Sequence, residues 1–257
     1  MKSLHSNILG EGVNHLIILH GFLGMGDNWK SQGKTFAKTG FKVHLLDQRN
    51  HGRSFWEKEF NYEALAKDLL LYMEEQNINN SVLIGHSMGG KTAMEFSVKF
   101  PERLSKLIIV DISPKKYVSS HNQILAGLSS FDFKIIKTRN EADFHLSKYV
   151  PEIEVRQFLL KNLYWISNGI LGLRLNISVL KNSSEEISKK INLSNIFNKP
   201  VLFLKGENSD YILKEDLKLI KKKFPKSQVN TIKNAGHWLH VENQKDFINT
   251  INTFLCS

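Results

Sequence analysis

The segment at residues 85–89, GHSMG, constrains this chain more than any other. An apolar run at residues 81–84 precedes it, and residues 91–100 after it have the spacing of an amphipathic helix. A strand, a sharp turn and a helix form the setting in which a G-x-S-x-G segment exposes its serine at the tip of the turn. The two glycines let neighbouring backbone approach closely, and the start of the helix supplies unpaired N–H groups. We therefore take Ser87 as the candidate nucleophile.

Segments typical of strands and of helices alternate along much of the chain. The apolar runs are nearly continuous, as in strands that are covered on both faces. Between them, apolar residues recur three and four apart, as along one face of a helix at residues 62–76. The predicted strands are 15–19, 41–46, 81–84, 107–110, 201–204 and 228–232, and the last helix is predicted at 239–255. This alternation predicts an α/β fold with a mostly parallel sheet and helices on both faces.

The alternation stops between residues 115 and 198, where helical patterns replace strands. We expect a core formed by residues 1–114 and 199–257, and a helical cap at residues 115–198 inserted before the last two strands. The cap would leave the sheet at the carboxyl end of one strand, which is the edge where open α/β sheets bind ligands. We therefore expect the cap to cover Ser87.

Length and composition are compatible with one large α/β domain: 257 residues, 41% of them hydrophobic. No apolar run approaches the roughly 20 residues that a membrane span needs. Residues 1–14 lack a long apolar stretch and a small-residue cleavage site, so we expect mature sequence there rather than a signal peptide. The single cysteine, Cys256, excludes an intramolecular disulfide. It favours a reducing compartment, and we expect a cytoplasmic location.

The formal net charge of +10 raises the question of an anionic partner. Lysines 221–223 lie among apolar residues with helical spacing, which is typical of a solvated helix face. We therefore expect a small-molecule substrate and no nucleic-acid partner. An anionic substrate remains open, and the sequence gives no indication of the oligomeric state.

A serine hydroxyl needs a base within hydrogen-bond reach to act as a nucleophile at neutral pH. Among ten histidines, His237 is the best candidate because it follows the last predicted strand. That position would bring it over the same edge of the sheet as Ser87. His240 falls inside the next helix and is expected to be structural. His86 is expected to pack beside the turn with its side chain pointing away from the nucleophile.

The base in turn needs a carboxylate that holds its tautomer. Asp111 directly follows the apolar run at 107–110, next to the strand that leads into Ser87. Asp210 follows the strand at 201–204, and Glu207 is a weaker third choice. We favour Asp111, although an aspartate before Ser-Pro can also simply cap a turn.

Hydrogen-bond donors for an oxyanion are expected from two backbone N–H groups. Met88 follows the nucleophile, and Phe22 lies in the loop at residues 20–24 after the first predicted strand. The Phe22 side chain would line the substrate pocket, and Leu23 and His86 are further candidates for that pocket. Metal-ligand patterns such as H-E-x-x-H and C-x-x-C are absent from the sequence, so we expect neither a metal nor a cofactor.

Taken together, these segments resemble the α/β-hydrolase superfamily over essentially the whole chain. The motifs at 20–21, 47–54, 85–89 and 236–237 fall in the order of that superfamily. The segments GHSMGGK, DQRNHGRS and VDISP are similar to those of the YbfF-type esterases. Many superfamily members carry the acid in a G-x-x-D turn after the cap, where Ser209 stands here. The YbfF-type group takes the acid from its Asp-Ile-Ser-Pro segment, which implies Asp111.

The resemblance implies a serine carboxylesterase that hydrolyses short- to medium-chain acyl esters without a cofactor. An acyl-coenzyme A thioesterase is the alternative within enzymes. A non-catalytic module that binds ligands on the same fold is the alternative from another class. The predicted cap is the least distinctive part of the chain, although its RLN segment at 174–176 also looks like one in that group.

Overall fold

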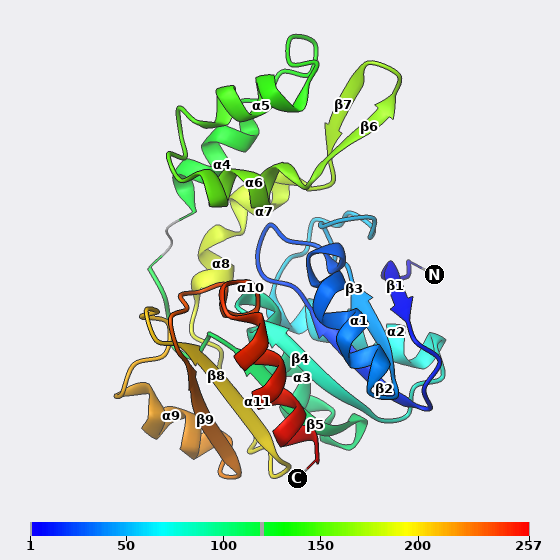
Figure 1. Cartoon of the computed structure of the whole chain (residues 1–257), viewed down its shortest axis with the longest axis vertical. Coiled ribbons are helices and arrows are strands. Elements are labelled where there is room, and N and C mark those ends of the chain that lie inside the picture. Colours follow the sequence, from blue (N-terminus) through cyan, green and yellow to red (C-terminus); the bar gives the residue numbers. More distant parts are fainter. Residues whose placement is uncertain (1, 119–120, 257) are drawn as a thin grey trace.

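The computed structural model describes residues 2–118 and 121–256 and shows a seven-stranded sheet with helices on both faces (Figure 1). The strand order is β1-β3-β2-β4-β5-β8-β9. Every pair is parallel except β1 with β3. The mostly parallel, doubly covered sheet expected from the sequence is thus confirmed. The four-residue edge strand β1 was not predicted, because its short and half-buried pattern carries little periodic signal.

The strands of the main sheet are β1 Ser6–Leu9, β2 Asn14–Leu19, β3 Phe41–Leu46, β4 Ser81–His86, β5 Leu104–Val110, β8 Val201–Gly206 and β9 Ser227–Ile232. The helices outside the insertion are η1 Gly26–Trp29, α1 Lys30–Lys38, α2 Tyr62–Glu75, α3 Met88–Lys99, η2 Pro101–Arg103, α9 Asp216–Lys223, α10 Leu239–Glu242 and α11 Gln244–Cys256. The helix predicted at 239–255 is therefore two helices, because the chain turns at Asn243 with an extended φ of −137°.

The apolar runs are continuous because each strand feeds two cores. In β2, Leu16 and Ile18 pack with residues of α1 and α11 on one face of the sheet. Ile17 and Leu19 point to the other face, where α2 and α3 lie. Alternate residues of a strand face opposite sides, so both sets must be apolar when both faces are covered.

The insertion lies between β5 and β8 and stands beyond the carboxyl ends of the strands (Figure 1). Its described elements are α4 Asn122–Ser129, α5 Arg139–Leu146, α6 Ile153–Leu160, β6 Leu163–Ser167, β7 Ile170–Leu173, α7 Ile177–Asn182 and α8 Ser184–Ser188. Besides the expected helices it holds an antiparallel hairpin, β6 and β7, which the sequence did not predict. Gly169 at the hairpin turn has a φ of +75°, a conformation that favours glycine. None of the described helices is both long enough and apolar enough to cross a membrane.

Buried histidines make the fold sensitive to acid. Burial lowers the pKa of His44 to about 4 and the pKa values of His51 and His240 to about 3. In the unfolded chain a histidine has a pKa of about 6.5. As the pH falls below that value, the unfolded state binds protons that the folded state does not, so stability decreases. We expect the urea midpoint to fall steadily between about pH 6.5 and pH 4.

The control for this prediction is His44→Gln, which removes one of these titrating groups. Its urea midpoint should fall less steeply with acid than that of the parent protein. A parent midpoint that does not change over the same pH range would contradict the expectation.

Candidate active site

The turn at Ser87 joins the end of β4 to the start of α3. Ser87 has φ +52° and ψ −115°, a strained combination for a residue with a side chain. A Cβ on Gly85 would lie 2.3 Å from the Gly89 carbonyl oxygen, and one on Gly89 would lie 2.4 Å from that of Leu19. Both positions therefore require glycine, and the turn brings Ser87 to the edge of the sheet. The Ser87 hydroxyl makes no hydrogen bond to any described residue, so it is free to meet a ligand.

The imidazole of His237 contacts the carboxylate of Asp111, with Nδ1 2.8 Å from Oδ2. Asp111 directly follows β5 and is completely buried. Its Oδ1 accepts a hydrogen bond from the Gly206 backbone N–H at 3.1 Å, and its Oδ2 also accepts one from the Ser209 hydroxyl. These donors hold the carboxylate in place and compensate for its burial. Asp210, the other candidate acid, is exposed on the turn after β8.

Ser209 stands where many members of the superfamily that this chain resembles carry the acid. Its hydroxyl donates a hydrogen bond to Asp111, the candidate acid at the end of the neighbouring strand β5. Ser209→Ala removes one donor to the buried Asp111 carboxylate. A hydrogen bond to a charged group contributes about 1.5–3 kcal/mol. We expect kcat to fall by about tenfold to a hundredfold, with little change in KM. Steady-state kinetics of the purified variant test this, and an unchanged kcat would show that the donor is dispensable.

His237 lies close to the turn that carries Ser87. The His86 ring centroid is 4.7 Å from that of His237, and His86 Nε2 lies 2.9 Å from the His237 carbonyl oxygen. Burial, followed by the neighbouring His237, lowers the pKa of His86 well below its usual value. A neutral His86 with its proton on Nε2 therefore donates to the His237 carbonyl oxygen, so the residue beside the candidate nucleophile helps to place the candidate base. On the other side, the Tyr211 ring stacks on His237 at 3.8 Å.

A cavity with an empty volume of about 370 Å³, part of it open to solvent, lies against the Ser87 turn. It is bounded by residues of the core, of the insertion and of the turn after β8. They are Phe22, Tyr62, Ser87, Met88, Lys91, Ile112, Tyr117, Val118, His121, Ile187, Ser188 and Tyr211. Leu23 and His86, which we expected in the substrate pocket, are not among these lining residues. Leu23 instead holds the insertion through its carbonyl oxygen, which accepts a hydrogen bond from Asn162 Nδ2 at 2.8 Å.

The two candidate oxyanion donors, Phe22 and Met88, both border this cavity beside Ser87. Within the described residues, neither of their backbone N–H groups donates to a protein acceptor. The Met88 N–H is the first N–H group of α3, and the first N–H groups of a helix have no acceptor within the helix. Two N–H groups without a protein acceptor beside the Ser87 hydroxyl could donate hydrogen bonds to an oxyanion formed there.

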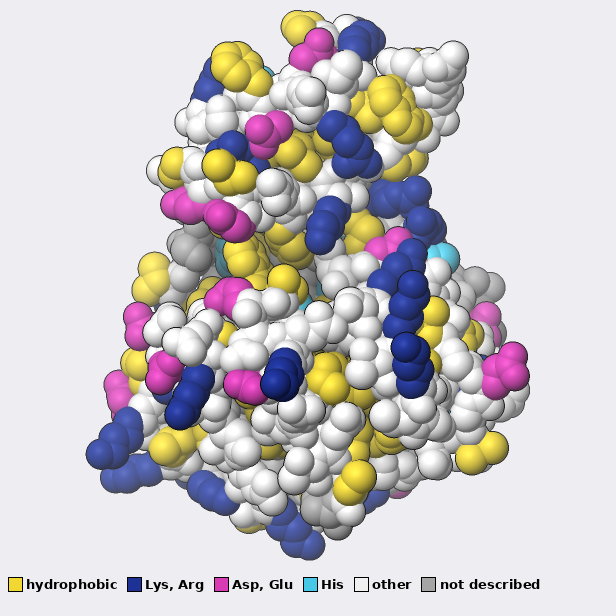
Figure 2. Space-filling view, in the orientation of Figure 1, with side chains coloured by type: hydrophobic (Ala, Val, Ile, Leu, Met, Phe, Trp, Pro, Cys, Tyr) yellow, Lys and Arg dark blue, Asp and Glu magenta, His cyan; other side chains and the backbone are white. Residues whose placement is uncertain are grey.

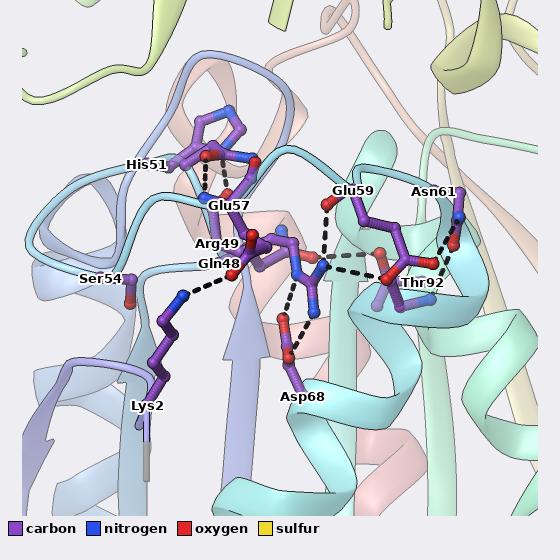
Figure 3. Close-up of polar contacts among 12 residues, drawn as sticks. Lys2, Gln48, Arg49, His51, Ser54, Glu57, Glu59, Asn61, Asp68 and Thr92 are labelled. Carbon is purple, nitrogen blue, oxygen red and sulfur yellow. Dashed lines mark hydrogen bonds and ion pairs between the residues drawn. The ribbon is translucent and has the colours of Figure 1, made fainter. Parts of the chain in front are cut away.

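The segment 47–54 fixes the loop that carries Phe22. His51 Nε2 accepts the Leu23 N–H at 3.2 Å, and His20 Nε2 accepts the Gln48 N–H at 3.0 Å. The same segment is also held to α3, because Thr92 of that helix donates to the Gln48 side chain at 3.0 Å (Figure 3).

Arg49 forms a bidentate pair with Asp68, at 2.5 Å and 2.7 Å (Figure 3). Both side chains are buried, so the pair ties the segment firmly to α2. The DQRNHGRS motif thus acts by positioning the loop over Ser87 rather than by contacting the cavity itself.

Lys91 is the most unexpected residue of the cavity wall. It lies one helical turn after Ser87 on α3, is only 1% exposed, and donates from Nζ to the Lys189 carbonyl oxygen. Its Nζ is 4.9 Å from the Tyr117 ring centroid and 5.6 Å from that of Tyr62. Burial lowers its pKa to about 7. Its spacing of four from the nucleophile could have indicated its place, but a lysine on a helix is usually solvated.

Apart from Phe22, the sequence did not indicate the aromatic residues of the cavity either, because they come from distant segments. Tyr117 donates from its hydroxyl to the Tyr211 carbonyl oxygen at 2.7 Å, and accepts the Ser113 N–H at 2.8 Å. The Asp-Ile-Ser-Pro segment is thereby joined to the ring that stacks on His237. In residues 2–118 and 121–256, no group of three or more His, Cys, Asp or Glu side chains is arranged to hold a metal ion.

Comparison with known proteins shows what this chain is similar to. The family model described as alpha/beta hydrolase fold matches residues 14–134. The sn-1-specific diacylglycerol lipase ABHD11 of Danio rerio is 37% identical over 93% of this chain and 78% of its own length. The chain belongs to the alpha/beta hydrolase family.

Two further similar proteins are matched over nearly their entire lengths. Esterase YbfF of Escherichia coli is 30% identical over 93% of this chain and 92% of its own. A solved structure described as a marine microorganism esterase superposes with a TM-score of 0.95, at 41% identity over 99% of this chain and 100% of that one. With relatives of this kind the chain is a carboxylic ester hydrolase, which sets aside the non-catalytic binding module.

Proposed function

We propose that this hydrolase is a serine carboxylesterase that cleaves short- to medium-chain acyl esters through Ser87, His237 and Asp111. The observation that carries the proposal is the 2.8 Å contact between His237 Nδ1 and buried Asp111, beside a cavity that holds the free Ser87 hydroxyl. An imidazole that donates from Nδ1 to a carboxylate keeps Nε2 available as a base. The missing Ser87–His237 hydrogen bond is compatible with this role, because such bonds tighten when substrate binds.

In the proposed reaction, His237 Nε2 takes the proton of Ser87 as Oγ attacks the ester carbonyl. The backbone N–H groups of Phe22 and Met88 stabilise the oxyanion of the tetrahedral intermediate. His237 then gives its proton to the leaving alkoxide, and an acyl-enzyme forms on Ser87. Water activated by His237 then attacks the acyl-enzyme ester, which releases the carboxylic acid product and regenerates the Ser87 hydroxyl. The Asp111 carboxylate stabilises the charged imidazolium.

The lining of the cavity beside Ser87 supports an acyl substrate. Its lining is mostly apolar and aromatic, which suits an acyl chain. We further propose that residues 115–198 act as the cap domain over a core of residues 1–114 and 199–257. The cytoplasmic location stays an expectation that rests on the lone cysteine.

A series of p-nitrophenyl esters from acetyl to palmitoyl, run beside the matching coenzyme A thioesters, tests the substrate class. We expect kcat/KM to peak at short to medium acyl chains and to be higher for oxygen esters than for thioesters of equal length. Ser87→Ala protein serves as the background control. A higher kcat/KM for the thioesters would move the assignment to an acyl-coenzyme A thioesterase.

A further inference from the structure

The hairpin β6–β7 presents hydrophobic side chains to solvent. Trp165, Ile166 and Ile170 are 52%, 60% and 47% exposed, and they flank the turn at residues 167–169. Figure 1 shows the hairpin projecting from the insertion, away from the sheet. Figure 2 shows hydrophobic side chains where the hairpin lies, with Lys and Arg side chains close by. Large side chains exposed together at the tip of a projecting element are typical of an interaction surface.

The hairpin has its own fixed structure beneath these exposed residues. Leu163 and Leu171 are buried at its base. Arg139 donates to the carbonyl oxygens of Leu160 and Leu163, both at 2.8 Å, and so ties the start of the hairpin to α5. The exposed side chains are therefore carried by an ordered hairpin that is hydrogen-bonded to α5.

The charged residues of the segment that holds the hairpin are all cationic. No acidic residue occurs between Glu154 and Glu185, whereas Arg156, Lys161, Arg174 and Lys181 lie in that stretch. Arg156 is paired with Asp143 of α5. Within the described part of the chain, none of the other three cations forms an ion pair with a carboxylate. Arg174 instead lies over the Tyr164 ring, 4.6 Å from its centroid. Apolar and aromatic residues at the tip, with unpaired Lys161 and Arg174 at the base of the hairpin, complement an anionic lipid surface.

We propose that the β6–β7 hairpin docks this protein onto anionic lipid surfaces, with Trp165, Ile166 and Ile170 entering the headgroup region. Tryptophan favours that region because its ring is apolar while its N–H can still reach polar partners. The flanking cations attract the negatively charged headgroups within a Debye length. The hairpin is too short to span a bilayer, so the contact is peripheral and reversible.

Flotation of the full chain with vesicles tests the proposal. Mixed phosphatidylglycerol and phosphatidylcholine vesicles should bind the protein, and pure phosphatidylcholine vesicles should bind it much less. The double variant Trp165→Ser, Ile166→Ser should lower the partition coefficient by about tenfold or more. Lys161→Gln, which changes an exposed charge, should lower it by about fivefold.

Matched controls separate this effect from misfolding and from catalysis. Trp56→Ser alters a tryptophan that is 53% exposed on the core, and it should bind vesicles like the parent. The hairpin variants should hydrolyse a water-soluble short-chain ester at the parent rate, which shows that they are folded. Ser87→Ala should still bind vesicles, so the result does not depend on the proposed reaction.

Three results would overturn the proposal. One is the absence of binding to the anionic vesicles, and another is equal binding to neutral ones. The third is a parent protein that dimerises in solution while the hairpin double variant stays monomeric, because the apolar tip would then pack against a second copy of this chain.

Discussion

Ser87→Ala is expected to lower kcat for a short-chain p-nitrophenyl ester by about 10⁶-fold, as loss of the nucleophile does in other serine hydrolases. The reason is chemical rather than structural. The acyl-enzyme cannot form without Oγ, and the remaining N–H groups and His237 can only assist direct attack by water. Stopped assays with a large excess of enzyme are needed, because the residual rate approaches the spontaneous one.

The structure predicts that this variant folds normally. The Ser87 hydroxyl makes no hydrogen bond to any described residue, and its strained backbone is fixed by Gly85 and Gly89. Thermal unfolding of Ser87→Ala should therefore match that of the parent closely. Turnover within tenfold of the parent would contradict the assignment of Ser87 as nucleophile.

Asp111→Asn is expected to lower kcat by about 10⁴-fold. An asparagine amide can donate to His237 Nδ1, which favours the tautomer with its proton on Nε2 and removes the base. The Ser209 hydroxyl and the Gly206 N–H would also lose their charged acceptor. The same substitution removes a buried charge, so unfolding should be measured beside the kinetics.

Asp210→Asn is the matched control, since Asp210 is exposed one residue beyond Ser209. We expect its kcat to stay within about twofold of the parent, as for most surface substitutions. If Asp210→Asn were the inactive variant and Asp111→Asn the active one, the acid would be Asp210 after β8 and not Asp111 after β5.

The core of the fold could be predicted because each of its strands is buried on both faces. A short, continuous apolar run such as residues 107–110, with helical segments before and after it, is typical of a central strand in a parallel sheet. The insertion lacks that constraint, and its hairpin depends on one glycine turn and on packing by Leu163 and Leu171. The edge strand β1 and the break at Asn243 likewise depend on tertiary contacts that no periodicity reveals.

The candidate catalytic residues could be named because parallel strands end at the same edge of a sheet. Asp111 and His237 are 126 residues apart in sequence, and the structure brings them into contact. Much of the cavity wall could not be named, because Lys91, Tyr117 and Tyr211 come from elements whose relative placement depends on how the insertion packs. Leu23 was expected in the substrate pocket from its place in a motif. It does not line this cavity, and its carbonyl oxygen accepts a hydrogen bond from Asn162 of the insertion.

The measurement that tests the central claim most directly is covalent labelling by a fluorophosphonate, followed by peptide mass spectrometry. The account predicts a single adduct on Ser87, formed rapidly in the parent and more slowly in Asp111→Asn. A folded protein that stays unlabelled, or that carries its adduct on a residue other than Ser87, would contradict the account.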